Sequence, residues 1–115
     1  MIIRLRDIEL KAYHGVLAEE KANGNLFRVS VSIETEEQPG CTTDRIEDTL
    51  NYKDIYDIVC REMSIASDLL EHVAWRIRRA LRGAYPDARH ITVSVSKQNP
   101  PVGGPVAWGE VETGD

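Results

Sequence analysis

The stretch Leu26-Phe27-Arg28-Val29-Ser30-Val31-Ser32-Ile33-Glu34-Thr35 alternates between apolar and polar side chains after its first residue. A period of two residues places successive side chains on opposite faces of a β-strand. The stretch therefore predicts a strand with one apolar face for a core and one face of serine and charge that meets water.

Three further segments have the same character. Residues 2–13 alternate loosely, and their apolar parity switches near Asp7, which predicts a strand with a β-bulge at that point. Residues 91–96 alternate as cleanly as the first stretch, and 106–112 predict the last strand. Connections with glycine, proline and asparagine are predicted as loops: residues 15–25, 37–50 and 98–105.

Two helices are predicted between the second and third strands. The first begins after Asn51, a side chain suited to cap a first turn. The second begins near Ser67, a predicted N-cap, and ends at Gly83 and Pro86. The order β-β-α-α-β-β predicts one α+β domain over residues 1–115, with a four-stranded antiparallel sheet and both helices on one face.

The other face of this predicted sheet carries arginine, serine and threonine, and its outer strands are open edges. Such edges are usually paired, covered or blunted, because their free N–H and C=O groups recruit other strands. Subunits joined edge to edge would close these sheets into a barrel with a polar interior. The pattern therefore predicts a homo-oligomer, without fixing the number of subunits.

Composition argues against several classes of partner. The formal net charge is −5 and no basic run is present, which disfavours nucleic acid. No apolar stretch approaches the roughly 18 residues that a membrane span needs. Charges interrupt the first residues, which predicts no signal peptide and a cytoplasmic location. Cys41 and Cys60 lack CxxC spacing, which is typical of reduced thiols, and the histidines form no metal motif.

Four short motifs follow one another on this predicted frame. They are Tyr13-His14-Gly15-Val16-Leu17-Ala18-Glu19-Glu20, Thr49-Leu50-Asn51-Tyr52, Leu69-Leu70-Glu71-His72 and Lys97-Gln98-Asn99-Pro100-Pro101. Through them the chain resembles the dihydroneopterin aldolase family over nearly its whole length, from Ile3 to Glu112. The resemblance implies the tunnelling fold, in which four subunits form a barrel and two rings stack into an octamer.

The resemblance also implies an activity in tetrahydrofolate biosynthesis. Family members cleave 7,8-dihydroneopterin by a retro-aldol reaction to 6-hydroxymethyl-7,8-dihydropterin and glycolaldehyde. A general base takes the proton of the 2′-hydroxyl group, the C1′–C2′ bond breaks, and an acid then protonates C1′. Because the dihydropterin ring accepts the electrons, the resemblance implies no Schiff base, no metal and no cofactor. The same chemistry permits epimerisation at C2′ to dihydromonapterin.

Three residues match catalytic positions of the family. The resemblance implies that Lys97 acts on the side-chain hydroxyl groups and that Tyr52 delivers the proton to C1′. Glu20 matches a loop glutamate near the reacting end of the pterin. Lys97 also has the parity of the apolar residues in 91–96, so its side chain lies on the same face as theirs, at the end of the strand.

Three more residues match binding positions. Glu71 matches the carboxylate that grips the amino-pyrimidinone edge of the pterin, and Leu70 would offer its backbone amide to the same edge. Val16 would contribute backbone contacts from a neighbouring subunit. A pterin presents its N2 amino group and N3–H as adjacent donors, which one carboxylate accepts in bidentate fashion.

Two alternatives to the aldolase remain open at the level of sequence. A dihydroneopterin triphosphate epimerase would bind the pterin edge in the same way but would need a cationic site for the triphosphate. A non-catalytic, ring-forming pterin-binding protein would not need Tyr52 and Lys97. The chain also departs from the family at Trp75, at Asn25, and at the helix connection 62–66, which lacks an expected glycine.

Overall fold

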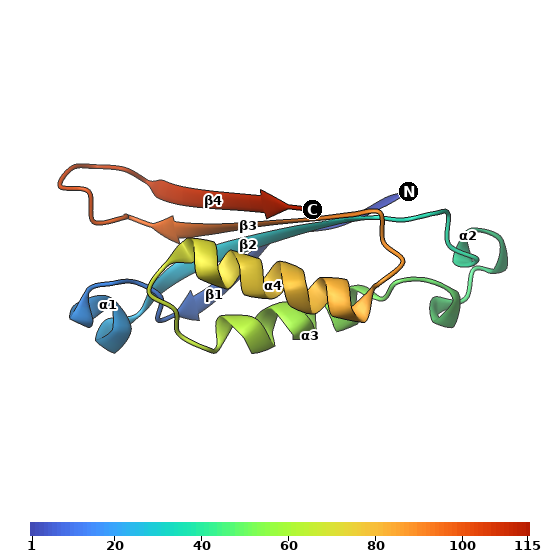
Figure 1. The fold of residues 1–115 in the computed structure, drawn as a ribbon, viewed down its shortest axis with the longest axis horizontal. Helices are drawn as coiled ribbons and strands as arrows, with labels where there is room; N and C mark the ends of the chain where they lie inside the picture. The colour runs from blue at the N-terminus through green and yellow to red at the C-terminus, as the bar shows by residue number, and fades with distance from the viewer.

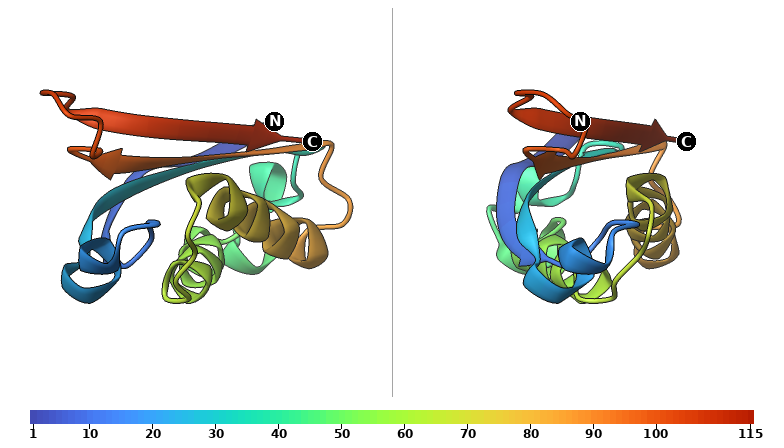
Figure 2. Two further views of the ribbon diagram at one scale, coloured as in Figure 1. Left: turned by 60° about the vertical axis from the view of Figure 1, so that its left-hand side comes forward. Right: turned by 90° about the vertical axis from the view of Figure 1, so that its left-hand side faces the viewer.

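A computed structural model describes all of residues 1–115. Four strands form one antiparallel sheet in the order β1-β2-β3-β4: β1 (Ile2–Ala12), β2 (Asn25–Glu34), β3 (His90–Gln98) and β4 (Trp108–Gly114). Two long helices and three short helical segments connect them: α1 (Ala18–Asn23), α2 (Gly40–Thr43), a 3-10 turn (Ile46–Asp48), α3 (Tyr52–Met63) and α4 (Leu70–Ala84). Helices α3 and α4 cover one face of the sheet (Figures 1 and 2), so the predicted fold class is confirmed.

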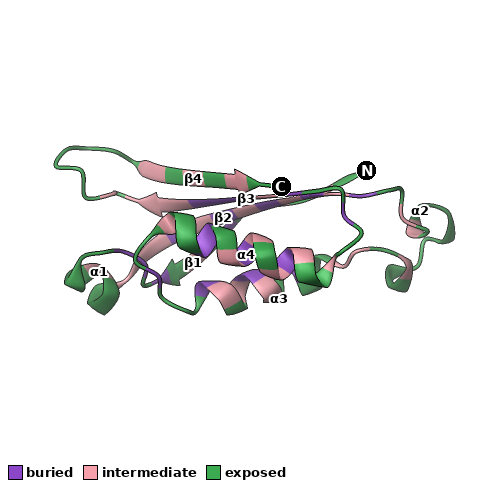
Figure 3. Ribbon diagram, in the orientation of Figure 1, coloured by how far each residue is buried: buried purple, intermediate pink, exposed green.

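The apolar face of the sheet and the apolar stripes of the two helices form one contiguous core (Figure 3). Val29, Ile77 and Val93 are fully buried in it. Burial of an aliphatic side chain of this size stabilises a fold by about 1.5–3 kcal/mol. The predicted bulge is confirmed as well, because the β1–β2 register shifts between Leu5 and Ile8.

Two predicted loops contain short helices, so those predictions were incomplete. In residues 15–25, the Glu20 side chain accepts a hydrogen bond from the Leu17 N–H at 3.2 Å and closes the first turn of α1. Gly24 ends this helix with a φ of +72°. Residues 37–50 contain α2 and the 3-10 turn, although their glycine and proline content predicted only a loop.

Two predicted boundaries were also wrong. Ser67 does not cap α4; Leu69 takes that position, and its carbonyl accepts from the amides three and four residues later. The last strand covers Trp108–Gly114 instead of 106–112. Its hairpin is closed by a hydrogen bond from the Asn99 N–H to the Ala107 carbonyl, so pairing with β3 begins one residue later.

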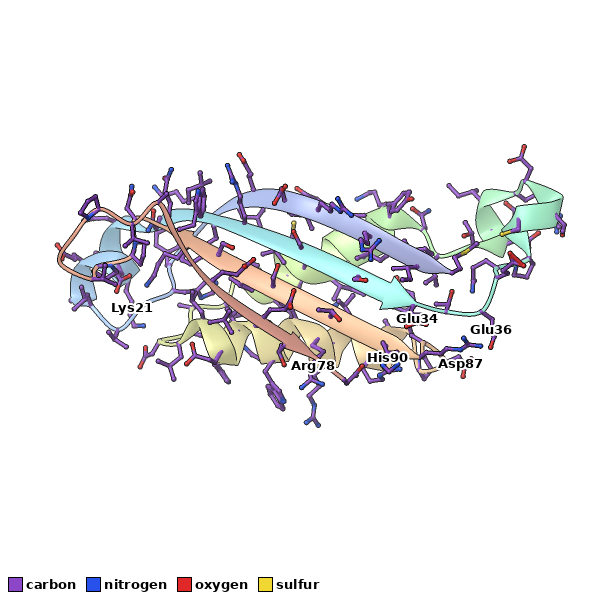
Figure 4. All side chains as sticks on the ribbon, turned by 90° about the horizontal axis from the view of Figure 1, so that it is seen from above. Lys21, Glu34, Glu36, Arg78, Asp87 and His90 are labelled. Atoms are coloured by element: carbon purple, nitrogen blue, oxygen red, sulfur yellow. The ribbon has the colours of Figure 1, made fainter.

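The sheet's second face has no helix on it (Figures 2 and 4). Strands β1 and β4 are its two edges. The molecule measures 52 × 22 × 21 Å, with a radius of gyration of 15.4 Å. A compact domain of this length would have about 13 Å, so the subunit is extended. None of its helices combines the length and the apolar character needed to cross a membrane.

Candidate active site

The end of β3 carries a lysine that is paired with a glutamate of α1. Lys97 continues the apolar row of β3 on the side that faces the helices, as its parity predicts. Its Nζ lies 2.6 Å from Oε2 of Glu20, and the two side chains are only 12% and 11% exposed. Because the pair is partly buried, removal of either partner would leave a poorly hydrated charge without its counter-charge.

Glu20 stays ionised although it is largely shielded from water. Burial by itself raises the pKa of this carboxyl group. The hydrogen bonds from Lys97 Nζ and from the Leu17 N–H outweigh the burial, so the pKa of Glu20 lies below its ordinary value. The site therefore holds a carboxylate bonded to an amino group, and such a pair can move a proton to or from a hydroxyl group.

The turn before α1 is shaped to receive this carboxylate. Gly15 has a φ of +149°, and a Cβ atom at this position would lie 2.6 Å from Oε2 of Glu20. Glycine avoids both the backbone strain and the collision. Lys21 donates to the Gly15 carbonyl at 2.7 Å and also pairs with the Asp68 carboxylate. The turn that leads into α1 is thus fixed against the segment that leads into α4.

Glu71 and Leu70 lie at the start of α4, just beyond Asp68. The first amides of a helix have no intrahelical acceptor, so Leu70 and Glu71 present N–H groups at this end. Glu71 is exposed, and its carboxylate can accept two donors from a ligand. Val16 is 65% exposed in the turn before α1, and α1 lies at this end of the molecule (Figure 1).

Tyr52 lies at the opposite end. It begins α3, is 60% exposed, and lines a hollow of about 450 Å³ with Ile3 of β1. Through β2, Ile3 aligns with Ile91, which lies six residues before Lys97 on β3. At about 3.3 Å per residue, roughly 20 Å of strand separates the two places. Figure 4 shows the length of the sheet, with Lys21 near one end and His90 near the other.

Within one chain, the turn before α1, α1 itself, the start of α4 and the end of β3 therefore lie at one end of the molecule. These elements carry five of the six predicted site residues: Val16, Glu20, Leu70, Glu71 and Lys97. Tyr52 does not join them. Residues 15–25 lie against the segment that leads into α4 of their own chain. Lys21 contacts Asp68, three residues before Glu71, and the Gly15 N–H donates to the Ser67 carbonyl at 3.0 Å.

A buried network that the sequence pattern did not single out joins these elements. His14 is fully buried, and its Nδ1 accepts a hydrogen bond from the Ser67 N–H at 3.0 Å. The Ser67 hydroxyl contacts Nδ1 of His72 at 2.8 Å and accepts from Nη2 of Arg76 at 2.9 Å. A signal was present, because His14 continues the apolar parity of β1 and so points toward the core.

Arg76 also explains how the connection between α3 and α4 forms without a glycine. Its guanidinium donates to the carbonyl of Glu62 at 2.9 Å and to the carbonyl of Ile65 at 2.8 Å. It pairs with the Glu62 carboxylate as well, at 3.1 Å. The Glu62 carbonyl lies in the last turn of α3 and the Ile65 carbonyl lies just beyond it, so the arginine side chain helps to satisfy the carbonyls at this helix end.

The remaining arginines of α4 are engaged elsewhere. Arg78 and Arg82 pair with Asp115, and Arg79 lies over the ring of Trp75. None of them gathers beside Glu20 and Lys97 to form a site for a triphosphate, which the epimerase alternative requires. Trp75, one of the positions at which the chain departs from the family, lies on the outer surface of α4 and is 42% exposed.

Lowering the pH is expected to destabilise the fold through His14. Burial, and after it three facing cations, lower the pKa of His14 from 6.5 to about 4; the Met63 carbonyl opposes them. The cations come from three elements: Arg76, Lys21 and Lys97. The unfolded chain binds this proton at a higher pH than the folded chain. The stability present above pH 6.5 is therefore lost as the pH falls toward 4.

The loss from this one group should reach about 3 kcal/mol. Urea unfolding at successive pH values measures the loss, and an NMR titration of the His14 ring identifies its source. A ring that titrates near 6.5 in the folded protein would contradict this explanation.

The chain matches known proteins over nearly its whole length. A family model described as Dihydroneopterin aldolase matches residues 3–113. A dihydroneopterin aldolase of Staphylococcus epidermidis is 33% identical over 104 residues, which cover 90% of this chain and 86% of that protein.

Solved structures show the same fold. The E. coli dihydroneopterin aldolase in complex with neopterin superposes with a TM-score of 0.90 at 17% identity, over 100% of this chain and 98% of that one. A dihydroneopterin aldolase from Burkholderia bound to guanine gives a TM-score of 0.75 at 18% identity, over 100% and 89% of the two chains.

Proposed function

The chain belongs to the dihydroneopterin aldolase family, and from this premise we propose that two copies of it together form each site that cleaves 7,8-dihydroneopterin. The observation that carries the proposal is the partly buried Lys97–Glu20 pair, which lies at the same end as the start of α4, whereas α3 begins with Tyr52 at the other end. The products are 6-hydroxymethyl-7,8-dihydropterin and glycolaldehyde.

The start of α4 is proposed to hold the part of the substrate that does not react. Glu71 would accept from the N2 amino group and N3–H of the pterin, and the Leu70 amide would donate to the same edge. Neopterin and guanine both carry this amino-pyrimidinone edge, and each is bound by one of the related structures. A carboxylate with two adjacent donors forms a bidentate, charge-assisted contact that fixes orientation.

The Lys97–Glu20 pair is proposed to act on the side chain of the substrate. With the pterin held at α4, the pair removes the proton of the 2′-hydroxyl group and the C1′–C2′ bond breaks. The bonding electrons move into the dihydropterin ring, and glycolaldehyde leaves. Tyr52 then delivers a proton to C1′. A positioned acid or base contributes typically ~10²–10⁴-fold to such steps.

Tyr52 is proposed to come from a second copy of the chain, because its own Lys97 is too far along the sheet. The open edges supply a route. Alternate antiparallel pairing makes β1 and β4 run in opposite directions, so β4 of one copy can continue into β1 of the next as an antiparallel pair. Closed barrels stagger their strands, and we propose that the stagger here brings the start of β1 close to the end of β3 in the adjoining copy.

Charge supports this joining of edges. On the uncovered face of the sheet, β1 carries Arg4 and Arg6 together with the acidic Asp7 and Glu9, while β4 carries Glu110 and Glu112. The two arginines give β1 positive partners for the acidic edge of β4, and two copies of β4 would repel each other. A ring of four copies, stacked in pairs to an octamer, is the assembly we propose. In it Val16 belongs to the chain that supplies Glu20, and does not reach the site from a neighbouring subunit as the resemblance implied.

Replacing Tyr52 with phenylalanine is expected to separate bond cleavage from product protonation. The ring remains, so packing changes little, but the phenolic proton is lost. Glycolaldehyde release should continue while formation of 6-hydroxymethyl-7,8-dihydropterin falls. Both products are measured in one time course. Equal yields of the two, at the wild-type rate, would contradict the role assigned to Tyr52.

The assay that tests the proposed function incubates the purified protein with 7,8-dihydroneopterin and looks for glycolaldehyde. Its appearance with equal 6-hydroxymethyl-7,8-dihydropterin supports the aldolase. The same samples show whether dihydromonapterin accumulates by epimerisation at C2′. Parallel samples with the triphosphate substrate test the epimerase alternative. Binding of the pterin without any conversion would indicate the non-catalytic alternative.

A further inference from the structure

We propose that His14 is a positioning residue for Glu20. It anchors the turn before α1, against which the Glu20 carboxylate packs, to the backbone of Ser67. His14 is fully buried, and it makes no hydrogen bond to either member of the Lys97–Glu20 pair. The consequence for turnover rests on the proposed function, whereas the anchoring of the turn does not.

The backbone N–H and C=O groups of Ser67 both form hydrogen bonds with the turn that contains His14 and Gly15. The Ser67 N–H donates to Nδ1 of His14 at 3.0 Å, and the Ser67 carbonyl accepts from the Gly15 N–H at 3.0 Å. The pair of bonds resembles one rung of a β-ladder, with the imidazole in place of a carbonyl oxygen. Gly15 is also the residue against which the Glu20 carboxylate rests. Anchoring Gly15 therefore fixes the backbone against which the Glu20 carboxylate packs.

The imidazole is well suited to this role. Since Nδ1 accepts a hydrogen bond, the neutral ring carries its proton on Nε2, which faces the Met63 carbonyl without closing a regular hydrogen bond. The ring packs edge-on against Phe27, with centroids 5.2 Å apart and planes at 80°. The side chain is fully buried, so its acceptor nitrogen is held in one direction by packing on all sides.

Loss of this acceptor should release the turn. The buried Ser67 N–H would lose its partner, and such an unsatisfied donor favours local rearrangement. Lys21 still donates to the Gly15 carbonyl, so the turn would shift rather than unfold. A displacement of about 1 Å in a catalytic group can cost about 100-fold in rate. Glu71, at the start of α4, would still hold the pterin edge.

Two substitutions separate the acceptor from the packing. His14→Leu fills the core but offers no acceptor. His14→Asn places Oδ1 where Nδ1 lies and can restore the bond to the Ser67 N–H. The matched control is His90→Leu, which removes an exposed histidine at the far end of β3. For each protein, turnover of dihydroneopterin and calorimetric affinity for 6-hydroxymethyl-7,8-dihydropterin are measured.

We expect His14→Leu to lose about 100-fold in turnover, with product affinity within a factor of about three of wild type, and His14→Asn to recover most of the loss. His90→Leu should match wild type. Unchanged turnover in His14→Leu would overturn the proposal. Equal losses in the Leu and Asn variants would do so too, because packing alone would then explain them. A parallel loss of product affinity would also count against it.

A measurement without substrate separates this proposal from the proposed function. The Glu20 carboxyl group is titrated by carbon-13 NMR in wild type and in both variants. In wild type its pKa lies below the ordinary value because Lys97 and Leu17 bond to it. His14→Leu should move the pKa toward the ordinary value and His14→Asn should restore it. Identical titrations in all three proteins would refute the anchoring of the turn, whether or not the protein is an aldolase.

Discussion

Lys97→Ala is expected to lower turnover by about 10²–10⁴-fold, the usual contribution of a positioned acid–base group, while product affinity changes little. The lysine meets Glu20 at the reacting end, whereas the pterin edge is assigned to α4. The substitution also leaves Glu20 in a place where its side chain is only 11% exposed, without its cation. Its carboxylate would then bind a proton more readily and serve poorly as a base.

Stopped-flow turnover and product calorimetry on the same preparation test this expectation. Arg89→Ala is the matched control, because it removes the cation of an exposed ion pair with Glu36 at the other end of β3. Such pairs contribute little, so turnover should stay at the wild-type level. A Lys97 variant that loses affinity as much as turnover would show that the lysine binds the pterin and does not act on its side chain.

Glu71→Gln is expected to weaken product binding by about 30- to 1000-fold. The substitution keeps the length of the side chain but replaces one acceptor oxygen with an NH₂ donor, which would face a pterin N–H. Loss of a charge-assisted bond together with an unsatisfied donor costs roughly 2–4 kcal/mol. Product and substrate should be affected alike, because the amino-pyrimidinone edge does not take part in the reaction.

Calorimetry with 6-hydroxymethyl-7,8-dihydropterin measures the effect directly. Glu37→Gln is a suitable control, since it changes an exposed carboxylate in the connection after β2. If the Glu71 variant binds product within a factor of about three of wild type, the carboxylate at the start of α4 is not the pterin anchor. The assignment of Leu70 to the same edge would then lose its support as well.

The sheet was predictable because side-chain parity is a local property. The alternation around Val29 and Val31 fixed which face is buried, and the switch of parity near Asp7 correctly indicated a bulge. The position of Lys97 at the end of an apolar row followed from the same rule. What parity could not supply was its partner, since the pairing with Glu20 spans 77 residues.

Other features escaped because they depend on tertiary contacts. Ser67 looked like a helix cap by residue type, but its amide and hydroxyl group are used by His14, His72 and Arg76. Helix α1 forms where the asparagine and glycine content indicated a loop, because Glu20 folds back onto the Leu17 amide. Tyr52 is separated from the other site residues because of the direction in which α3 runs along the sheet. None of the four sequence motifs carries information on that direction.

The central claim is that Tyr52 of one copy completes the site of another, and co-assembly of two defective variants tests it most directly. Lys97→Ala and Tyr52→Phe are co-expressed in equal amounts, purified as mixed assemblies, and assayed for 6-hydroxymethyl-7,8-dihydropterin. If each site takes Lys97 and Tyr52 from different copies, random mixing in a symmetric ring leaves about a quarter of the sites intact, and that share of wild-type activity should return. If mixed assemblies form and activity stays at the level of the separate variants, both residues act within one chain and the shared site is wrong.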